Sequence, residues 1–503
     1  MTDRDALELL KAEDRKLVAL KHAISVLEWD FETGSPEKAS DERAEQMSLL
    51  SVMYHDEVVG DRFASIVDAI ENTDGFTDAE CALVRKWKKD LREEKAVPSE
   101  LVERISRIQA ECHVKWLEAR EKDDFSIFRD PLERMIEALK EQCLLIYPDR
   151  APYDTLLDIY EPGMTTADID PLFDELEERI HEIMDRIGEK AASTDDSFLM
   201  QEYDEKALHG FCLDVMKRMG FDFSRGAVGI SAHPFTTTLG RDDVRITTRY
   251  TDDSIFDPIG SVVHETGHAL YEQNCALNPE IRGTSLSDGV SMGIHESQSR
   301  FWENFMGRSD AFWRFEYPIL QERIPSLKDV DFDSFMKAAN RSVPSAIRVN
   351  ADELTYSLHI ILRYRLEKKL FSGEIKVDDI PSEWKKMSTE IVRYTPKNDT
   401  EGCLQDCHWA GGSFGYFPTY ALGNVYAAMF REALIEHLGG EDKLDEALST
   451  GHFEEITSWQ RDNIWYNGSI YEPKLLLRKA TGKDLSLEPY VRYLSEKFYK
   501  IFG

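Results

Sequence analysis

Hydrophobic residues recur at helical spacing along most of the chain. Between residues 6 and 28 the apolar positions form one helical stripe with charged residues between them: Leu7, Leu10, Leu17, Leu20, Ile24 and Leu27. We expect this helix to end at Trp29-Asp30, before a turn at Gly34-Ser35-Pro36. The pattern then predicts a second helix from about Ser40 through Val59.

Long charged helices are predicted next. Residues 78 to 120 are rich in Glu, Lys and Arg and predict two antiparallel helices interrupted near Val97-Pro98. Their charged faces are typical of solvated helix surfaces and require no partner. Residues 125–148 and 168–193 are again helical in period, with a turn at Pro162-Gly163 between them.

The helical pattern breaks between Ala227 and Tyr250. Threonine and β-branched residues are frequent there, and a Gly-Arg-Asp-Asp turn divides the segment, so we expect a short hairpin or small sheet. A helical run from Gly260 to Glu272 follows it directly. Such a sheet could bind an extended peptide as an added strand or could only brace the helix, and the sequence leaves both interpretations open.

No internal repeat, low-complexity tract or Pro/Ser-rich linker divides the 503 residues. We therefore expect one domain over residues 1–503, a mainly α body with two helical lobes around a long groove and a small β-sheet. Residues 410–430 carry no charge, but their glycine, proline, threonine and asparagine content argues against a membrane span. We expect a buried loop and helix there.

The charge balance restricts the possible partners. Lys and Arg number 61 against 95 Asp and Glu, which gives a formal net charge of −34. Such an acidic protein is not expected to bind nucleic acid or an anionic membrane. The first residues lead into an amphipathic helix and not an apolar signal, so we expect a cytoplasmic protein.

The seven cysteines are scattered and odd in number, which favours reduced thiols over a disulfide framework. Cys403, Cys407 and the adjacent His408 have the residue types of a metal site. A structural zinc site normally draws four ligands from two short-spaced pairs, and no second pair is present. We therefore do not expect a second metal there.

The helical run from Gly260 to Glu272 contains the sequence His-Glu-x-x-His. Residues four apart share one face of a helix, so His264 and His268 can bind the same metal ion. Glu265 lies about 100° around the helix, beside the ion, where a base that deprotonates water is needed. By itself, the motif favours a zinc hydrolase over an amphipathic helix with two polar residues on its wet face.

A catalytic zinc site needs a third protein ligand and a position for water. The helical segment from Gly293 to Asn304 supplies two candidates, His295 and Glu296. We favour Glu296, because Arg300 is one helical turn later and can hold its carboxylate in place. His295 would then lie behind the ligands or face the substrate.

Further polar residues follow downstream. Arg348 is predicted on a helix, where it could pair with Asp352 or grip a carboxylate through two hydrogen bonds. A Gly-rich loop with His408, Tyr416 and Tyr420 could approach a ligand and donate to an oxyanion, although aromatic residues in such loops more often pack.

These motifs together resemble the carboxypeptidase Taq family of zinc carboxypeptidases, over nearly the whole chain. The resemblance rests on the following segments, in order: Trp29-Asp30, Arg43-Ala44-Glu45-Gln46, Tyr160-Glu161-Pro162-Gly163, His233-Pro234-Phe235, Asp243-Val244-Arg245-Ile246-Thr247, His264-Glu265-Thr266-Gly267-His268, His295-Glu296-Ser297-Gln298-Ser299-Arg300, Ile347-Arg348-x-x-Ala351-Asp352 and Gly402-x-x-Gln405-Asp406-x-His408-Trp409. Each is weak apart from the zinc motif, but the ordered set is specific.

The resemblance implies a mostly helical fold with a long active-site groove, a small sheet near the zinc, and a homodimer. It also implies one zinc per subunit, held by His264, His268 and Glu296, with Glu265 as general base and acid. Arg348 is expected at the C-terminal carboxylate of the substrate. The run from His408 is also similar to a segment of the thimet oligopeptidase group, in which a tyrosine at the Tyr420 position steadies the oxyanion.

We therefore predict a zinc metallocarboxypeptidase that releases single C-terminal residues from peptides with broad specificity. Zinc would lower the pKa of its water to about 7, and cobalt or manganese could substitute for it. Glu265 would move the proton, and Tyr420 or His408 would donate to the oxyanion. Further candidates for substrate binding are His233, Asp243, Arg245 and Tyr416. The alternatives are a zinc endo-oligopeptidase and a helical scaffold with a vestigial motif.

Overall fold

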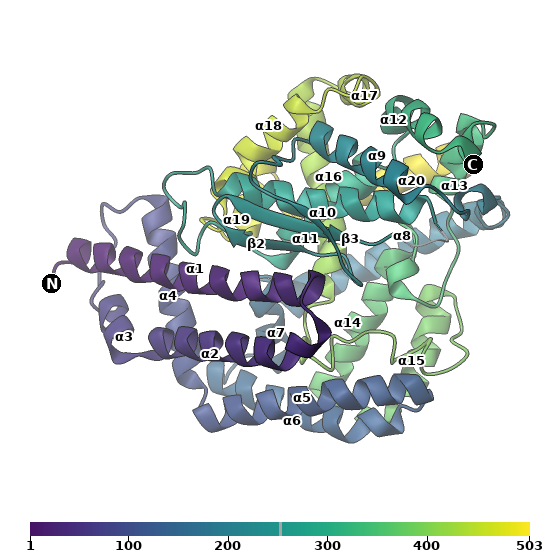
Figure 1. Ribbon diagram of the computed structural model, residues 1–503. Coiled ribbons are helices and arrows are strands. Elements are labelled where there is room, and N and C mark those ends of the chain that lie inside the picture. The colour runs from purple at the N-terminus through teal and green to yellow at the C-terminus, as the bar shows by residue number, and fades with distance from the viewer. Residues whose placement is uncertain (251–253) are drawn as a thin grey trace. The chain divides into compact units, whose positions relative to one another are not determined.

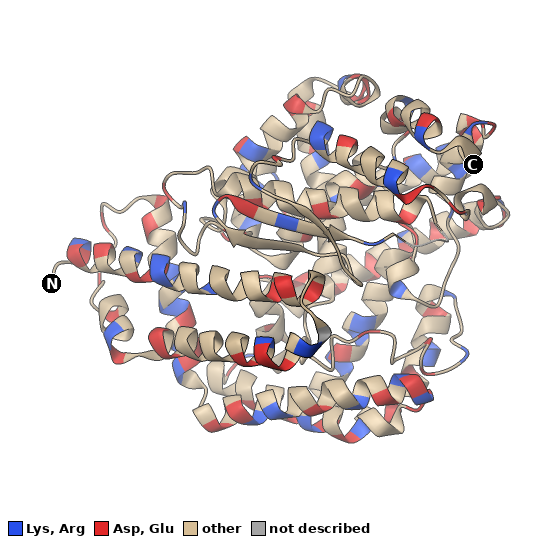
Figure 2. Ribbon diagram, in the orientation of Figure 1, with Lys and Arg blue, Asp and Glu red and all other residues tan. Residues whose placement is uncertain are grey.

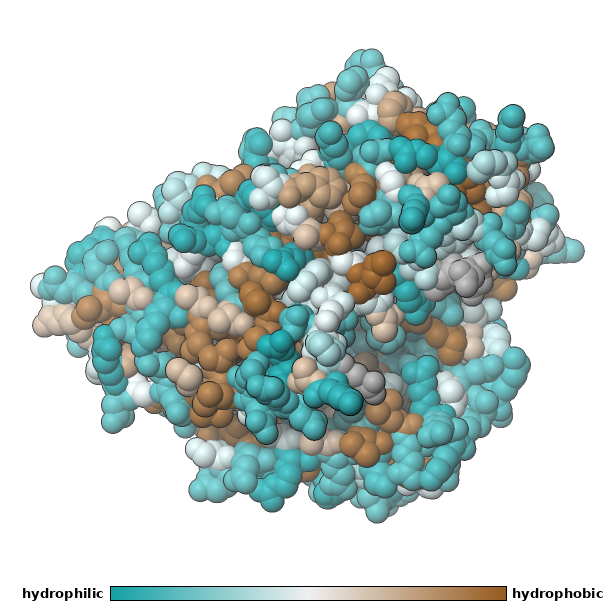
Figure 3. Space-filling view, in the orientation of Figure 1, coloured by the Kyte–Doolittle hydropathy of each residue, from teal (hydrophilic) through white to brown (hydrophobic). Residues whose placement is uncertain are grey.

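The computed structural model describes residues 1–250 and 254–503, and most of them are helical (Figure 1). A single small sheet accompanies the helices in the described part of the chain. The expected fold class, mainly α with a small sheet, is confirmed. Acidic and basic residues are interspersed along the helices (Figure 2), and hydrophilic residues cover most of the face shown in Figure 3.

The chain forms two compact units. The first comprises Met1–Glu94, Asp195–Ala339 and Tyr426–Leu485, and the second Lys95–Thr194, Asn340–Val425 and Ser486–Gly503. α16 (Pro418–Leu438) begins in the second unit and ends in the first. A single domain with two lobes around a groove stays a prediction.

The first unit holds the sheet and most of the helices. Its helices are α1 (Asp3–Thr33), α2 (Ser40–Val59), α3 (Asp61–Asp68), α4 (Asp78–Ala96), α9 (Glu205–Met219), α10 (Phe256–Cys275), α11 (Met292–Arg300), α12 (Asp310–Arg323), α13 (Phe332–Ala339), α17 (Glu441–Ser449), α18 (Glu454–Asn463) and α19 (Pro473–Thr481). A π-helical turn, Phe301–Met306, continues α11.

The first helix is longer than its hydrophobic pattern predicts. Thr2 and Asp5 exchange hydrogen bonds in a capping box, which starts α1 at Asp3. Its stripe of Leu7, Leu10 and Leu17 is buried, as expected. The helix continues past Trp29-Asp30 to Thr33, because the amide of Gly34 still donates to the carbonyl of Asp30. The predicted end at Trp29-Asp30 was therefore wrong by one turn.

The sheet lies next to α10 and consists of three strands (Figure 1). They are β1 (Val228–Ile230), β2 (Thr236–Gly240) and β3 (Asp243–Thr248), in the order β1-β3-β2. β2 and β3 form the expected antiparallel hairpin, while β1 adds to β3 in parallel. Val244 and Ile246 are fully buried, and this face of the sheet packs against α10.

The second unit consists of helices and loops in its described residues. Its helices are α5 (Ser99–Lys122), α6 (Ser126–Ile146), α7 (Pro152–Tyr160), α8 (Thr166–Ala192), α14 (Tyr356–Ser372), α15 (Ile380–Met387) and α20 (Glu488–Phe502). The break before α5 at Val97-Pro98 is confirmed, and Pro98 is the residue that precedes the helix. The pattern missed α7, which precedes the predicted turn at Pro162-Gly163.

The uncharged segment, residues 410–430, forms a loop and the first part of α16, and most of its residues are buried. This confirms the predicted loop and helix. In the described residues, no helix is both long and apolar enough to cross a membrane.

Candidate metal centre and associated polar clusters

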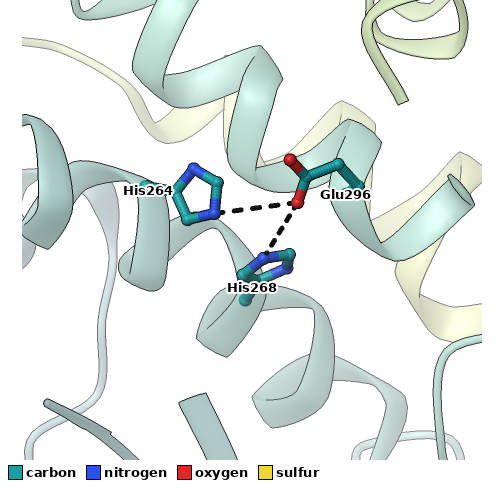
Figure 4. A group of neighbouring side chains, drawn as sticks. All are labelled: His264, His268 and Glu296. Atoms are coloured by element: carbon teal, nitrogen blue, oxygen red, sulfur yellow. Dashed lines mark ion pairs between the residues drawn. The ribbon is translucent and has the colours of Figure 1, made fainter. Parts of the chain in front are cut away.

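Three side chains converge in the first unit. His264 and His268 project from one face of α10, and Glu296 reaches them from α11 (Figure 4). Oε2 of Glu296 lies 3.7 Å from Nε2 of His264 and 3.4 Å from Nε2 of His268. The three candidate ligand atoms lie within 4.8 Å of one another, a spacing that one metal ion can bridge. This is the only such group among the described residues.

Gly267 allows α10 and α11 to approach closely enough to form this group. A Cβ atom at this position would lie 2.5 Å from the carbonyl oxygen of Gln298 and 2.7 Å from Cα of Ser299. Both atoms belong to the backbone, which cannot move aside without moving α11. The glycine between the two histidines therefore places Glu296 opposite them.

Both histidines are bonded on the side that faces away from Glu296. Nδ1 of His264 is 2.7 Å from Oε2 of Glu303, and Nδ1 of His268 is 2.6 Å from Nδ1 of His295. Their Nε2 atoms therefore remain available to bind one metal ion. Two imidazoles and one carboxylate suit a divalent metal ion, so the residues fit the metal that the sequence predicts.

Glu296 is held as a carboxylate. Nε of Arg300 donates to its Oε1 over 2.6 Å, and the hydroxyl of Ser299 donates to its Oε2 over 3.0 Å. Burial opposes ionisation, but Arg300 and the two histidines outweigh it and lower the pKa of Glu296. The predicted role of Arg300 in holding the ligand is consistent with this geometry.

The two histidines differ in their electrostatic surroundings. Burial and the neighbouring His295 lower the pKa of His268 to about 3, so this ring is neutral, as a metal ligand must be. Burial also opposes charge on His264, but Glu296 and Glu303 outweigh it and raise its pKa to about 9. A metal ion would replace the proton that His264 holds in its absence.

Glu265 is buried beside the candidate ligands, and it accepts a hydrogen bond from a residue of the sheet. The hydroxyl of Thr236 donates to Oε2 of Glu265 over 2.6 Å. Burial raises the pKa of Glu265, and the bond from Thr236 acts in the opposite direction. β2 thus braces the metal-binding helix, while peptide addition to the sheet stays a prediction. The residue pattern gave no signal for Thr236, because its position depends on the strand register.

Asp243 and Arg245 pair with each other on β3. Arg245 donates to both oxygens of Asp243, over 2.8 and 2.7 Å. They alternate with the buried Val244 and Ile246 and therefore face away from α10. Asp243 and Arg245 therefore do not lie on the face of the sheet that holds Glu265. His233 is exposed, and its backbone carbonyl accepts from the hydroxyl of Ser231.

Arg348 forms a buried network in the second unit. Its Nε and Nη2 atoms donate to Oδ1 of Asp406 over 3.0 and 2.8 Å, and Nε of Arg363 donates to Oδ2 over 2.7 Å. Burial opposes ionisation of Asp406, but the two guanidinium groups outweigh it and lower its pKa. Two arginines thus share one carboxylate, which leaves a positive charge.

The predicted helix at Arg348 was wrong, and of the two alternatives for its partner the structure does not show the pair with Asp352. Arg348 begins a short 3₁₀ turn, Arg348–Asn350, and does not lie on an α-helix. Its partner is Asp406 and not Asp352, which accepts hydrogen bonds from Ser342 and from the backbone before α14. Asp406 is 58 residues from Arg348, so no local periodicity signals the pair.

Tyr420 and His408 lie beside Arg348, and Tyr416 packs against Tyr420. Nε2 of His408 is 3.2 Å from the hydroxyl of Tyr420, and the guanidinium of Arg348 lies 5.1 Å from the Tyr420 ring centroid. The ring of Tyr416 meets that of Tyr420 edge to face at 5.1 Å. Burial lowers the pKa of His408 to about 4, so the ring is neutral and can donate or accept.

The mainly helical fold, the His-Glu-x-x-His motif and the glutamate on the next helix are together typical of a mainly helical metallopeptidase. A family model, carboxypeptidase Taq (M32) metallopeptidase, matches residues 9–498. Carboxypeptidase 1 of Bacillus subtilis is 38% identical over 502 residues, 99% of this chain and 98% of that protein. Thermostable carboxypeptidase 1 of Thermus thermophilus is 37% identical in an alignment of 516 positions, which covers 100% of this chain and 100% of that protein.

The solved structures agree. A crystal structure of an M32 carboxypeptidase from Deinococcus radiodurans superposes with a TM-score of 0.95 at 31% identity, over 99% of this chain and 100% of that one. The chain belongs to the carboxypeptidase Taq (M32) family of metallopeptidases. It is a metallocarboxypeptidase, and the endo-oligopeptidase alternative is not favoured.

Proposed function

We propose that the protein uses one zinc ion per subunit to release single C-terminal residues, with broad preference, from peptides that have a free C-terminus. The convergence of His264, His268 and Glu296 is the observation that carries this proposal. Nitrogen and oxygen donors of this kind suit zinc, and cobalt or manganese can take its place. When bound, such an ion acts as a Lewis acid that polarises a carbonyl group and makes water nucleophilic near neutral pH.

Glu265 is proposed as the general base and then the general acid. Its carboxylate accepts a proton from the attacking water and passes it to the amine that leaves. Two features support this role: burial raises its pKa toward the working range of a base, and Thr236 fixes one of its oxygens. The other oxygen stays available for the transfer.

Arg348 is proposed to bind the C-terminal carboxylate of the substrate. The positive charge that remains when Arg348 and Arg363 share Asp406 supports this assignment. Recognition of that carboxylate is what makes the enzyme an exopeptidase. Tyr420 or His408 donates to the oxyanion, and each such donor is worth roughly 10²–10³-fold in rate.

Four further residues are proposed to contact the substrate: His233, Asp243, Arg245 and Tyr416. We also propose that residues 1–503 act as one catalytic domain, that the protein is a cytoplasmic homodimer, and that neither nucleic acid nor membrane is a partner. The net charge of −34 supports the last point. Light scattering on the purified protein tests the dimer.

The deciding experiment compares two dipeptides that are blocked at the N-terminus and differ only at the C-terminus. A carboxypeptidase releases the last residue of the free acid and leaves the C-terminal amide intact. A chelator should abolish the activity, and stoichiometric zinc should restore it. Equal cleavage of both dipeptides would favour an endopeptidase, and absence of bound metal would overturn the proposed site.

A further inference from the structure

The Nδ1 atoms of the two histidine ligands have different hydrogen-bond partners. Nδ1 of His264 meets the carboxylate of Glu303 directly. Nδ1 of His268 instead meets another imidazole, that of His295, whose Nε2 lies 2.8 Å from Oε1 of Glu272. The carboxylate that backs His268 is thus one side chain further from the metal position. The sequence predicted His295 behind the ligands or facing the substrate, and it did not single out Glu272.

The residues behind His268 are tightly constrained. Glu272 is 5% exposed, and its Oε2 accepts from the hydroxyl of Thr238 on β2 over 3.2 Å. The amide of Gly289 donates to Oε1 over 3.3 Å. Burial of a carboxylate costs free energy, and the three hydrogen-bond donors around Glu272 compensate for that cost. The donors fix Glu272 as an acceptor for His295.

The ring of His295 is also fixed by packing. Its centroid lies 4.5 Å from that of His268 and 5.5 Å from that of Tyr271. On another side the backbone of Gly289 touches the ring, since a Cβ atom there would lie 2.6 Å from Cδ2 of His295. The ring can therefore neither tilt nor slide away from His268 without displacing a neighbour.

We propose that His295 and Glu272 are positioning residues for the metal ligand His268. With Nε2 of His268 committed to the metal, its Nδ1 carries the ring proton and donates to Nδ1 of His295. Nε2 of His295 then donates to Oε1 of Glu272. This one-way chain selects the tautomer and the orientation in which His268 binds metal. The inference rests on the proposed zinc site.

Two substitutions at His295 separate hydrogen bonding from packing. His295→Leu fills the space but offers no acceptor to His268. His295→Asn keeps a carbonyl oxygen close to where Nδ1 of the imidazole lies. Loss of a residue that orients a metal ligand typically weakens metal binding 10–100-fold, so His295→Leu should raise the zinc dissociation constant by about that factor. His295→Asn should retain most of the affinity.

A third variant displaces the ring without changing its chemistry. Gly289→Ala places a methyl group against Cδ2 of His295 and should also weaken zinc binding, by roughly tenfold. The matched control is His209→Leu, in the same unit. The Nδ1 atom of His209 bonds Tyr250, 2.7 Å away, with no contact to the metal ligands, so its zinc affinity should equal that of the parent.

The readouts are zinc dissociation constants from competition with a chromophoric chelator and the visible spectrum of the cobalt-substituted proteins. Weakened binding and an altered cobalt spectrum in His295→Leu, largely restored in His295→Asn, support the proposal. Parental values in His295→Leu, or equal weakening in both variants, overturn it. If His295→Leu fails to fold, Gly289→Ala decides: weakened binding supports the proposal and parental binding overturns it. A parent that binds no zinc would instead refute the proposed metal site.

Discussion

The hydroxyl of Thr236 on β2 donates a 2.6 Å hydrogen bond to Oε2 of Glu265 on α10. The same hydroxyl lies 3.0 Å from the backbone carbonyl oxygen of Glu265. A strand that lies ahead of the metal-binding motif thus fixes the side chain to which we assign proton transfer. Burial raises the pKa of that carboxyl, while the nearby His264 and the hydrogen bond from Thr236 lower it.

Removing the Thr236 hydroxyl should change the pH profile of the enzyme. In Thr236→Val the bond that lowers the pKa of Glu265 is lost, so the pKa rises further. Because Glu265 must be ionised to accept a proton, the acid limb of kcat/KM should move to higher pH. Hydrogen bonds to charged groups contribute about 1.5–3 kcal/mol, which corresponds to roughly a tenfold or greater loss of activity on that limb. Thr236→Ser should keep the parental profile; an unmoved acid limb in Thr236→Val would contradict the prediction.

Gly267 is predicted to be essential for the spacing of the two metal-binding helices. Gly267→Ala would force its methyl group into the backbone of α11, so we expect weaker zinc binding and a loss of about 1–3 kcal/mol in unfolding free energy. Gly260→Ala, on the same helix, is the matched control. Nothing lies within 4 Å of a Cβ atom at Gly260, and alanine there should stabilise the helix by up to about 1 kcal/mol. Thermal unfolding and chelator competition measure both effects, and equal behaviour of the two variants would refute the prediction.

Arg348→Ala should reduce carboxypeptidase activity far more than metal binding. The variant removes one of the two guanidinium groups around Asp406, so the remaining charge no longer attracts a substrate carboxylate. Loss of one partner of a buried charge pair costs about 2–5 kcal/mol, so kcat/KM should fall by roughly 30-fold or more, mainly through KM. Steady-state kinetics on a free-acid peptide test this. Arg129→Ala, which removes a more exposed ion pair with Asp378 in the same unit, should leave the kinetics unchanged. Parental activity of Arg348→Ala on free C-termini would remove the assignment.

Glu265→Gln should separate chemistry from metal binding. The amide cannot accept the proton of the attacking water, while His264, His268 and Glu296 keep their places. General base catalysis is worth roughly 10²–10⁴-fold, so kcat should fall by at least that much with zinc content unchanged. Metal analysis and hydrolysis assays on the same sample provide the test, and an active variant would exclude Glu265 as the base.

The mainly helical fold, several of its helices and the three candidate ligands were predictable from sequence, because periodicity and the i,i+4 rule are local. His264 and His268 share one face of a single helix, and Glu296 was distinguished by Arg300, one turn away. Two residues behind the ligands, Glu272 and Glu303, were not predictable in the same way. Glu303, on the π-helical turn that follows α11, bonds His264 on α10, and no local sequence pattern indicates that contact.

Asp406 illustrates the same limit in the second unit. It lies within a motif that carries the family resemblance, yet its two arginine partners are 58 and 43 residues away. The position of a carboxylate that binds two guanidinium groups depends on how a loop folds, whereas the local pattern offered Asp352 as one of two alternatives. The strand register that faces Arg245 away from α10 is likewise a tertiary property.

All three candidate ligands and the residues that orient them belong to one compact unit, while Arg348, Asp406, His408 and Tyr420 belong to the other. The two tasks that we propose for them, activating water and recognising a chain end, thus belong to different stretches of the sequence. Mutational libraries confined to residues 340–425 that spare His408 and Tyr420 can therefore search for new residue preferences while the proposed metal ligands and Glu265 stay unchanged.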